Sequence, residues 1–107
     1  MMEAVSLSNR LQTVADMVTG RRVADIGCDH GFVSIYLVQA KKADHVLAAD
    51  VRPGPLSRAQ QHIKEVQLTP YIETRLSDGL AGVTPEDRVD TVILAGMGGR
   101  LMRRILG

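Results

Sequence analysis

The chain has 107 residues, which suffices for one domain with a modest hydrophobic core. Apolar residues make up 45% and charged residues 23%, which excludes wholesale disorder, while 3% aromatic residues argue against a stacking surface for single-stranded nucleic acid. The net charge of +1 selects neither an acidic nor a basic partner.

The single cysteine, Cys28, has no partner for an internal disulfide and cannot supply the thiolates of a zinc cluster. We therefore expect a reducing, cytoplasmic compartment and no bound metal. No apolar run approaches the ~20 residues of a membrane span, so we expect no membrane association.

Apolar spacing predicts a helix and then a strand at the start of the chain. Leucine and valine recur at helical intervals over residues 8–18, so residues 1–20 should contribute one N-terminal helix, with Ser6 or Ser8 as its cap. Residues 22–27 are short, largely apolar and end in a glycine turn, which is typical of a buried parallel strand.

Helices and strands continue to alternate through the middle of the chain. Residues 32–40 predict a helix and residues 46–50 a second strand. The Pro-Gly-Pro run at 53–55 predicts a turn that starts another helix, with its second proline at the first helical position. Residues 71–76 alternate weakly between apolar and polar and predict a third strand.

The last part of the chain predicts a loop at 84–87, a clear fourth strand at 90–95, a glycine-rich turn at 96–99 and a helix over 100–106. Residues 21–107 then have the order β-α-β-α-β-β-α. This order predicts an α/β fold, a Rossmann-like parallel sheet with helices on both faces. Ligands bind such sheets beyond the carboxyl ends of the strands.

The turn after the first strand carries the strongest site signal, the sequence Asp-Ile-Gly-Cys-Asp-His-Gly at 25–31. Gly27 permits a tight turn, and Gly31 permits close approach of the backbone to a ligand or to the sheet. The three-glycine spacing of nicotinamide sites is missing, and Asp25 and Asp29 would repel a pyrophosphate. These acids suit the ammonium and sulfonium of S-adenosylmethionine, although Asp25 alone is also compatible with a simple turn cap.

The next strand ends carry weaker signals of the same kind. Asp50 follows Gly27 at about the spacing expected of an acid that accepts from ribose hydroxyls. Asp78, with Gly79, can accept from an adenine amino group, although the pair is also an ordinary turn signal. The glycine-rich turn at 96–99 would border the transferred methyl group, or could be a plain strand-to-helix turn.

At these residues the chain resembles the bacterial TrmK family of tRNA (adenine(22)-N1)-methyltransferases. The similarity rests on runs at five places: Leu7 to Leu11, Val23 to Gly31, Asp50 to Leu56, Arg75 to Leu80 and Ala95 to Gly99. The resemblance implies a class I methyltransferase fold, S-adenosyl-L-methionine as cofactor and tRNA as partner.

The resemblance also implies roles for particular residues. Asp29 and Met97 would border the target adenine as the catalytic pair. The expected cofactor-binding residues are Asp25, Gly27, Cys28, Gly31, Asp50, Val51, Asp78, Gly79 and Ala95. The expected substrate-binding residues are Gly96, Gly98 and Arg100. Arg100 belongs to a small basic cluster, and the alternative interpretation of this cluster is a solvated helix face.

Family members continue beyond the fourth strand, so we expect a truncated product or a fragment. Such a chain would expose its fourth strand as an edge, which favours self-association, and would methylate tRNA poorly by itself. The leading function is methyl transfer to N1 of an adenine in tRNA. The alternatives are a non-catalytic module that binds S-adenosylmethionine and, less favoured, a nicotinamide-binding domain.

Overall fold

The structure is a computed structural model that describes residues 7–18, 20–94 and 100–103. The α-helices are α1 (Asn9–Asp16), α2 (Phe32–Gln39) and α3 (Pro53–Glu65), and two 3-10 helices follow, η1 (Gly79–Gly82) and η2 (Pro85–Asp87). The strands are β1 (Arg22–Ile26), β2 (His45–Asp50), β3 (Ile72–Leu76), β4 (Thr91–Leu94) and β5 (Arg100–Arg103). The four strands and three helices predicted up to residue 95 are confirmed within a few residues.

The strands form one sheet in the order β3-β2-β1-β4-β5. The first four are mutually parallel, as the alternation of strands and helices predicts. Their carboxyl ends therefore meet at one edge of the sheet, where Asp25 pairs in register with Ala48, and Asp50 with Leu76. The acidic residues at the strand ends therefore lie along this edge.

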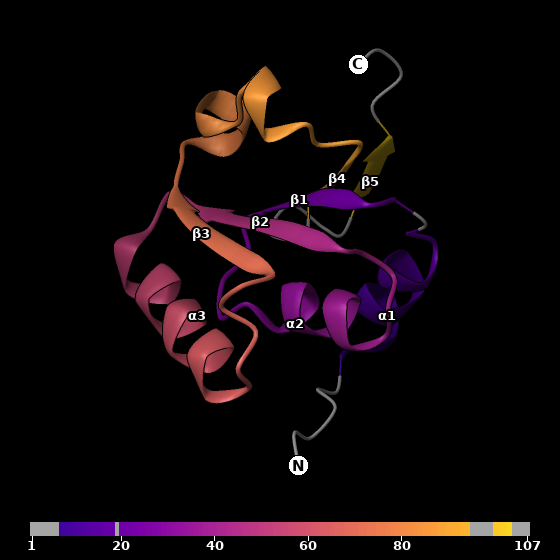
Figure 1. Cartoon of the computed structure of the whole chain (residues 1–107), viewed down its shortest axis with the longest axis horizontal. Coiled ribbons are helices and arrows are strands. Elements are labelled where there is room, and N and C mark those ends of the chain that lie inside the picture. The colour runs from indigo at the N-terminus through magenta and orange to yellow at the C-terminus, as the bar shows by residue number, and fades with distance from the viewer. Residues whose placement is uncertain (1–6, 19, 95–99, 104–107) are drawn as a thin grey trace.

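The three α-helices all pack on one face of the sheet (Figure 1). Ile35 and Leu37 of α2 are fully buried there against strand residues such as Val46 and Ile93. Each such aliphatic side chain contributes about 1.5–3 kcal/mol on burial. The α2 helix lies between the sheet and its neighbouring helices α1 and α3. Its apolar side chains are therefore distributed around the helix, and it lacks a distinct polar face.

The opposite face carries a smaller cluster that joins strand residues to Val89 in the segment after η2. Figure 1 shows the η1–η2 segment above the sheet, on the side away from the α-helices. The expectation of helices on both faces is therefore met on this second face by two short 3-10 helices. The connection from β3 to β4 spans residues 77–90, and Pro85 within it lacks the backbone N–H that a continuous α-helix would need there.

Two helix starts can be compared with the sequence predictions. Ser8 caps α1, because its hydroxyl oxygen accepts a hydrogen bond of 3.3 Å from the backbone N–H of Leu11. Helix α3 begins at Pro53, two residues before the predicted first position at Pro55. Both prolines still lie in the first turn, where the missing N–H costs no intrahelical bond.

The segment predicted as a helix over 100–106 is instead a strand at its start. Residues 100–103 form β5, which pairs antiparallel with β4, with Leu94 opposite Arg100 and Thr91 opposite Arg103. The helix prediction is wrong because a short run with mixed apolar and basic residues fits both periods, and pairing satisfies the backbone groups of β4. The exposed β4 edge, on which the expected self-association depended, is thus covered by β5.

Candidate functional site

The turn after β1 lies against the end of β2. The backbone N–H groups of Gly27 and Cys28 donate hydrogen bonds of 2.8 and 3.0 Å to the carbonyl of Ala49. Gly27 has a φ of 72° and Asp29 a φ of 53°, both in the left-handed region. Such a conformation is uncommon for a non-glycine residue, and Asp29 shares it with Lys41, Gln67 and Arg88, none of which lies at this turn.

Asp25 is completely buried beneath this turn. Its Oδ2 accepts a hydrogen bond of 2.7 Å from the Ser34 hydroxyl on α2. Its Oδ1 is buried and has no hydrogen-bond partner among the described residues. Burial raises the pKa of the Asp25 carboxyl to about 6. An unpartnered buried carboxylate oxygen is costly in the folded protein and fits a site that receives a donor from a ligand.

Asp50, at the end of β2, is 2% exposed and accepts four hydrogen bonds. The backbone N–H groups of Arg52 and Asp29 donate at 2.9 and 3.0 Å, and the Arg52 guanidinium donates at 3.2 and 3.3 Å. Burial raises the pKa of the carboxyl, but these donors outweigh it, so the pKa of Asp50 lies below its usual range. Asp50 is therefore an ionised acceptor at neutral pH.

Arg52 joins the acids of the two strand ends. Besides its bonds to Asp50, its Nη2 lies 3.6 Å from Oδ1 of Asp29, and both these side chains are more than half exposed. Sequence reasoning missed Arg52 and also Ser34. The signals were a cation two positions after a strand-end acid and a hydroxyl inside an apolar helix, each of which is also common without any function.

Gly31 caps the start of α2 with a φ of 83°. A Cβ at this position would lie 3.0 Å from the Cβ of Ala59 on α3. The close approach that Gly31 permits is therefore to the neighbouring helix, rather than to the sheet. Its expected contact with a cofactor stays a prediction.

Cys28 is buried behind the acidic turn. Burial, followed by the nearby charges of Asp25, Asp50 and Asp29, raises the pKa of its thiol far above the ordinary range. A thiol that stays protonated is a poor nucleophile. The raised pKa argues against Cys28 as a nucleophile, and its expected contact with a cofactor stays a prediction.

The end of β3 lies at the same edge, because the backbone N–H of Ser77 donates to the carbonyl of Asp50 at 2.9 Å. The next residue, Asp78, is exposed, and Gly79 starts η1 with a φ of 59°. Val51 is exposed as well, with 56% of its surface accessible. These three predicted cofactor residues thus follow neighbouring strand ends.

The remaining predicted residues are only partly covered by the structure. Ala95, Gly96, Met97 and Gly98 lie outside the described residues. Arg100 starts β5 opposite Leu94 in the sheet. Among the residues that the structure describes, no group of three His, Cys, Asp or Glu side chains is placed to hold a metal ion, and no helix is long and apolar enough to cross a membrane.

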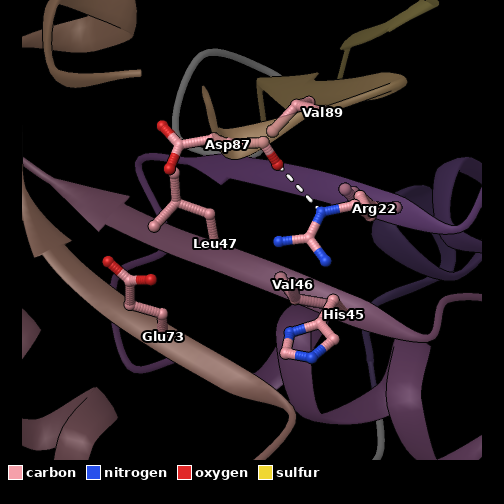
Figure 2. Close-up of a pocket in the computed structure, with 8 residues that line it drawn as sticks. Arg22, His45, Val46, Leu47, Glu73, Asp87 and Val89 are labelled. Carbon is pink, nitrogen blue, oxygen red and sulfur yellow. Dashed lines mark hydrogen bonds between the residues drawn. The ribbon is translucent and has the colours of Figure 1, made fainter. Parts of the chain in front are cut away.

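A separate shallow pocket lies on the sheet face away from the α-helices, near the amino ends of β1 and β2 (Figure 2). Arg22 and His45 line it with Glu73, and the Nε of Arg22 donates a hydrogen bond of 2.8 Å to the carbonyl of Asp87. None of the predicted site residues lines this pocket. The strand-end acids therefore define the candidate site.

The profile of a family described as a methyltransferase domain matches residues 7–107. The chain belongs to this methyltransferase domain family. It is 38% identical over 106 residues to the tRNA (adenine(22)-N(1))-methyltransferase of Bacillus subtilis (strain 168), covering 98% of this chain and 44% of the relative. The methyltransferase domain described above thus spans less than half the length of this curated relative.

Two solved structures resemble this methyltransferase domain. M. capricolum TrmK in complex with S-adenosyl-homocysteine is 41% identical, with a TM-score of 0.68 over 69% of this chain and 33% of that one. Streptococcus pneumoniae Sp1610 in complex with S-adenosyl-L-methionine is 32% identical, with a TM-score of 0.77 over 81% of this chain and 41% of that one. The resemblance to the TrmK family that the motifs indicate is confirmed.

Proposed function

We propose that this chain is the cofactor-binding part of an S-adenosylmethionine-dependent enzyme that methylates N1 of an adenine in tRNA, in the cytoplasm. The observation that carries the proposal is the pair of buried carboxylates, Asp25 and Asp50, at neighbouring strand ends. The relatives add support, since one is a tRNA (adenine(22)-N(1))-methyltransferase and another is solved with S-adenosyl-homocysteine.

The hydrogen-bond acceptors of the site, together with the amino end of α2, fit the chemical groups of S-adenosylmethionine. The unpartnered Oδ1 of Asp25 would accept from the α-ammonium, and the amino end of α2 would favour the carboxylate. Asp50 would accept from the ribose hydroxyls, and Asp78 from the adenine amino group. A pyrophosphate would instead meet several carboxylates, so a nicotinamide dinucleotide fits poorly.

The cofactor supplies an electrophilic methyl group on a sulfonium, and N1 of adenine has the lone pair that attacks it. The protein therefore needs no strong base, and its contribution is to position the adenine and exclude water. Asp29, held in a left-handed conformation at the mouth of the turn, would orient the exocyclic amino group. Met97 would pack against the base.

The second candidate function is a binding module that holds the cofactor without turnover. Asp25 and Asp50 bear on cofactor binding alone, so their burial at neighbouring strand ends is compatible with this function as well. Both candidates share the cofactor site, and they differ in whether methyl groups reach tRNA.

Calorimetric titration of the chain with S-adenosylhomocysteine and with NAD tests the shared part. We expect binding of the first ligand alone, whereas binding of NAD alone would overturn the proposal. A radiolabelled methyl-transfer assay on unmodified tRNA separates the two candidates. Incorporation of label at adenine N1 supports the enzyme, and binding without incorporation supports the module.

A further inference from the structure

The Arg52 side chain lies across the carboxylate that would receive the ribose. Its Nε donates to Oδ1 of Asp50 at 3.2 Å, and its Nη2 donates to Oδ2 at 3.3 Å. The guanidinium thus engages both oxygens at once, the two-point geometry that suits arginine and carboxylate.

The four donors on Asp50 divide into two kinds. Each carboxylate oxygen accepts one backbone N–H, from Arg52 on Oδ1 and from Asp29 on Oδ2. Each oxygen also accepts one N–H of the guanidinium. The two backbone donors are fixed by the turns after β1 and β2, while the two side-chain donors leave if the arginine rotates away.

A ribose offers two hydroxyl donors on adjacent carbons. These can replace the two guanidinium donors one for one, which leaves the buried carboxylate as well satisfied as before. The same two acceptor positions cannot serve the guanidinium and the hydroxyls together, because a carboxylate has about four acceptor sites and the backbone uses two.

The guanidinium is free to leave. The Arg52 side chain is 59% exposed, and its other ion pair, at 3.6 Å, is with Asp29, whose side chain is 58% exposed. Rotation of the side chain breaks neither the Arg52 backbone bond to Asp50 nor the start of α3 at Pro53.

We propose that Arg52 sets the affinity and the association rate of the cofactor site by occupying Asp50 until ribose hydroxyls displace it. The inference rests on the proposed function, because it takes Asp50 as the ribose acceptor. The chain binds only in the fraction of molecules whose guanidinium has rotated away, so the apparent dissociation constant rises by the inverse of that fraction. An ion pair whose arginine is more than half exposed reduces the fraction by about two- to fivefold.

The test compares the 107-residue chain with three variants, Arg52→Ala, Arg52→Lys and the control Arg58→Ala, in which an exposed arginine of α3 is removed. S-adenosylhomocysteine is titrated by calorimetry, and stopped-flow mixing gives the rate constants. We expect Arg52→Ala to bind about two- to fivefold more tightly, through faster association at an unchanged dissociation rate. Arg52→Lys, which lacks the two-donor fork, should fall between wild type and alanine.

Cooperative thermal unfolding verifies that each variant is folded. If Arg52→Ala does not fold, the affinity of Arg52→Lys relative to wild type tests the inference instead. Equal or weaker binding by the Arg52 variants, with wild-type binding intact, overturns this inference and leaves the proposed function standing. Absence of binding by every protein, wild type included, overturns both. A gain that Arg58→Ala shares would be an effect of charge in general and would also overturn it.

Discussion

The hydroxyl of Ser34 donates a 2.7 Å hydrogen bond to Oδ2 of Asp25, and both side chains are fully buried between α2 and the sheet. Ser34 thus supplies the side-chain donor to the Asp25 carboxyl, whose Oδ1 has no hydrogen-bond partner among the described residues. The folded chain therefore holds a partly satisfied acid in its core, a cost that a bound ligand can offset.

Removing the Ser34 hydroxyl takes away the side-chain donor of the buried Asp25 carboxyl. We expect Ser34→Ala to lower the free energy of unfolding by about 1–3 kcal/mol, because a buried polar group loses its partner. Urea denaturation followed by circular dichroism measures the change. Ser57→Ala, at an exposed position of α3, is the matched control and should stay within about 0.5 kcal/mol. Equal effects of the two substitutions would argue against the Ser34–Asp25 bond.

The raised pKa of Asp25, about 6, makes stability depend on pH. The folded protein keeps a proton on this carboxyl in a range where the unfolded chain, with a pKa near ~3.9, has lost it. The resulting stability is fully present below about pH 4 and is lost as the pH rises through about 6, by roughly 2–3 kcal/mol. Asp50 has a lowered pKa and acts the opposite way, since its contribution is lost as the pH falls through that lower value.

Asp25→Asn removes the titrating group at nearly constant shape. We expect the variant's free energy of unfolding to stay flat between about pH 4.5 and 7, where the wild type declines. We also expect it to bind S-adenosylhomocysteine more weakly, because a neutral amide replaces the acceptor for the ammonium. Denaturation at several pH values and calorimetry measure the two effects. A decline as steep in the variant as in the wild type would assign the pH dependence to another group.

The sequence predicts β1, β2 and β4 well because each is a short, largely apolar run, whereas β3 alternates weakly and is supported by its place in the order of strands and helices. Residues 22–26 and 91–94 are largely apolar, and in a chain where strands and helices alternate such short runs indicate buried parallel strands. Residues 100–103 have no single dominant pattern. Their strand depends on the partner edge of β4, which is a tertiary fact that local periodicity does not contain.

Some residues of the candidate site are predictable from the sequence, and others depend on tertiary contacts. Asp25 and Asp50 are predictable because strand ends and acids are both visible in the sequence. Arg52 is not, because its role depends on how the guanidinium folds back onto a carboxylate two residues away. Gly31 was expected to face a ligand or the sheet, yet its contact is with Ala59, a residue 28 positions later whose approach depends on helix packing.

The packing at Gly31 gives a test of backbone strain. Gly31→Ala would place a Cβ on a left-handed residue and 3.0 Å from the Cβ of Ala59. We expect a loss of about 1–3 kcal/mol in the free energy of unfolding. Gly54→Ala is the matched control, since a Cβ there meets nothing within 4 Å and the residue lies in the first turn of α3. That control should be neutral or stabilise by up to about 1 kcal/mol. A comparable loss in both variants would contradict the account.

Asp50 has two roles at the site, because it accepts hydrogen bonds from the turns after β1 and β2 and would also hold the ribose. Asp50→Asn keeps the size of the side chain but replaces one acceptor oxygen by an amide donor, which then faces either the Asp29 N–H or the Arg52 N–H. We expect a loss of about 1–3 kcal/mol in the free energy of unfolding, because a buried donor meets a donor. We also expect S-adenosylhomocysteine to bind more than about tenfold more weakly, since charged acceptors make the stronger hydrogen bonds.

Asp44→Asn is the control for Asp50→Asn, because this aspartate is 73% exposed and its ion pair with Arg21, at 3.8 Å, is worth little. It should leave both stability and ligand binding near wild type. Denaturation and calorimetry on the same preparations separate the two losses in Asp50→Asn, because binding is measured well below the unfolding temperature. A variant that stays folded and binds within about twofold of wild type would mean that Asp50 organises the turns without holding the ribose.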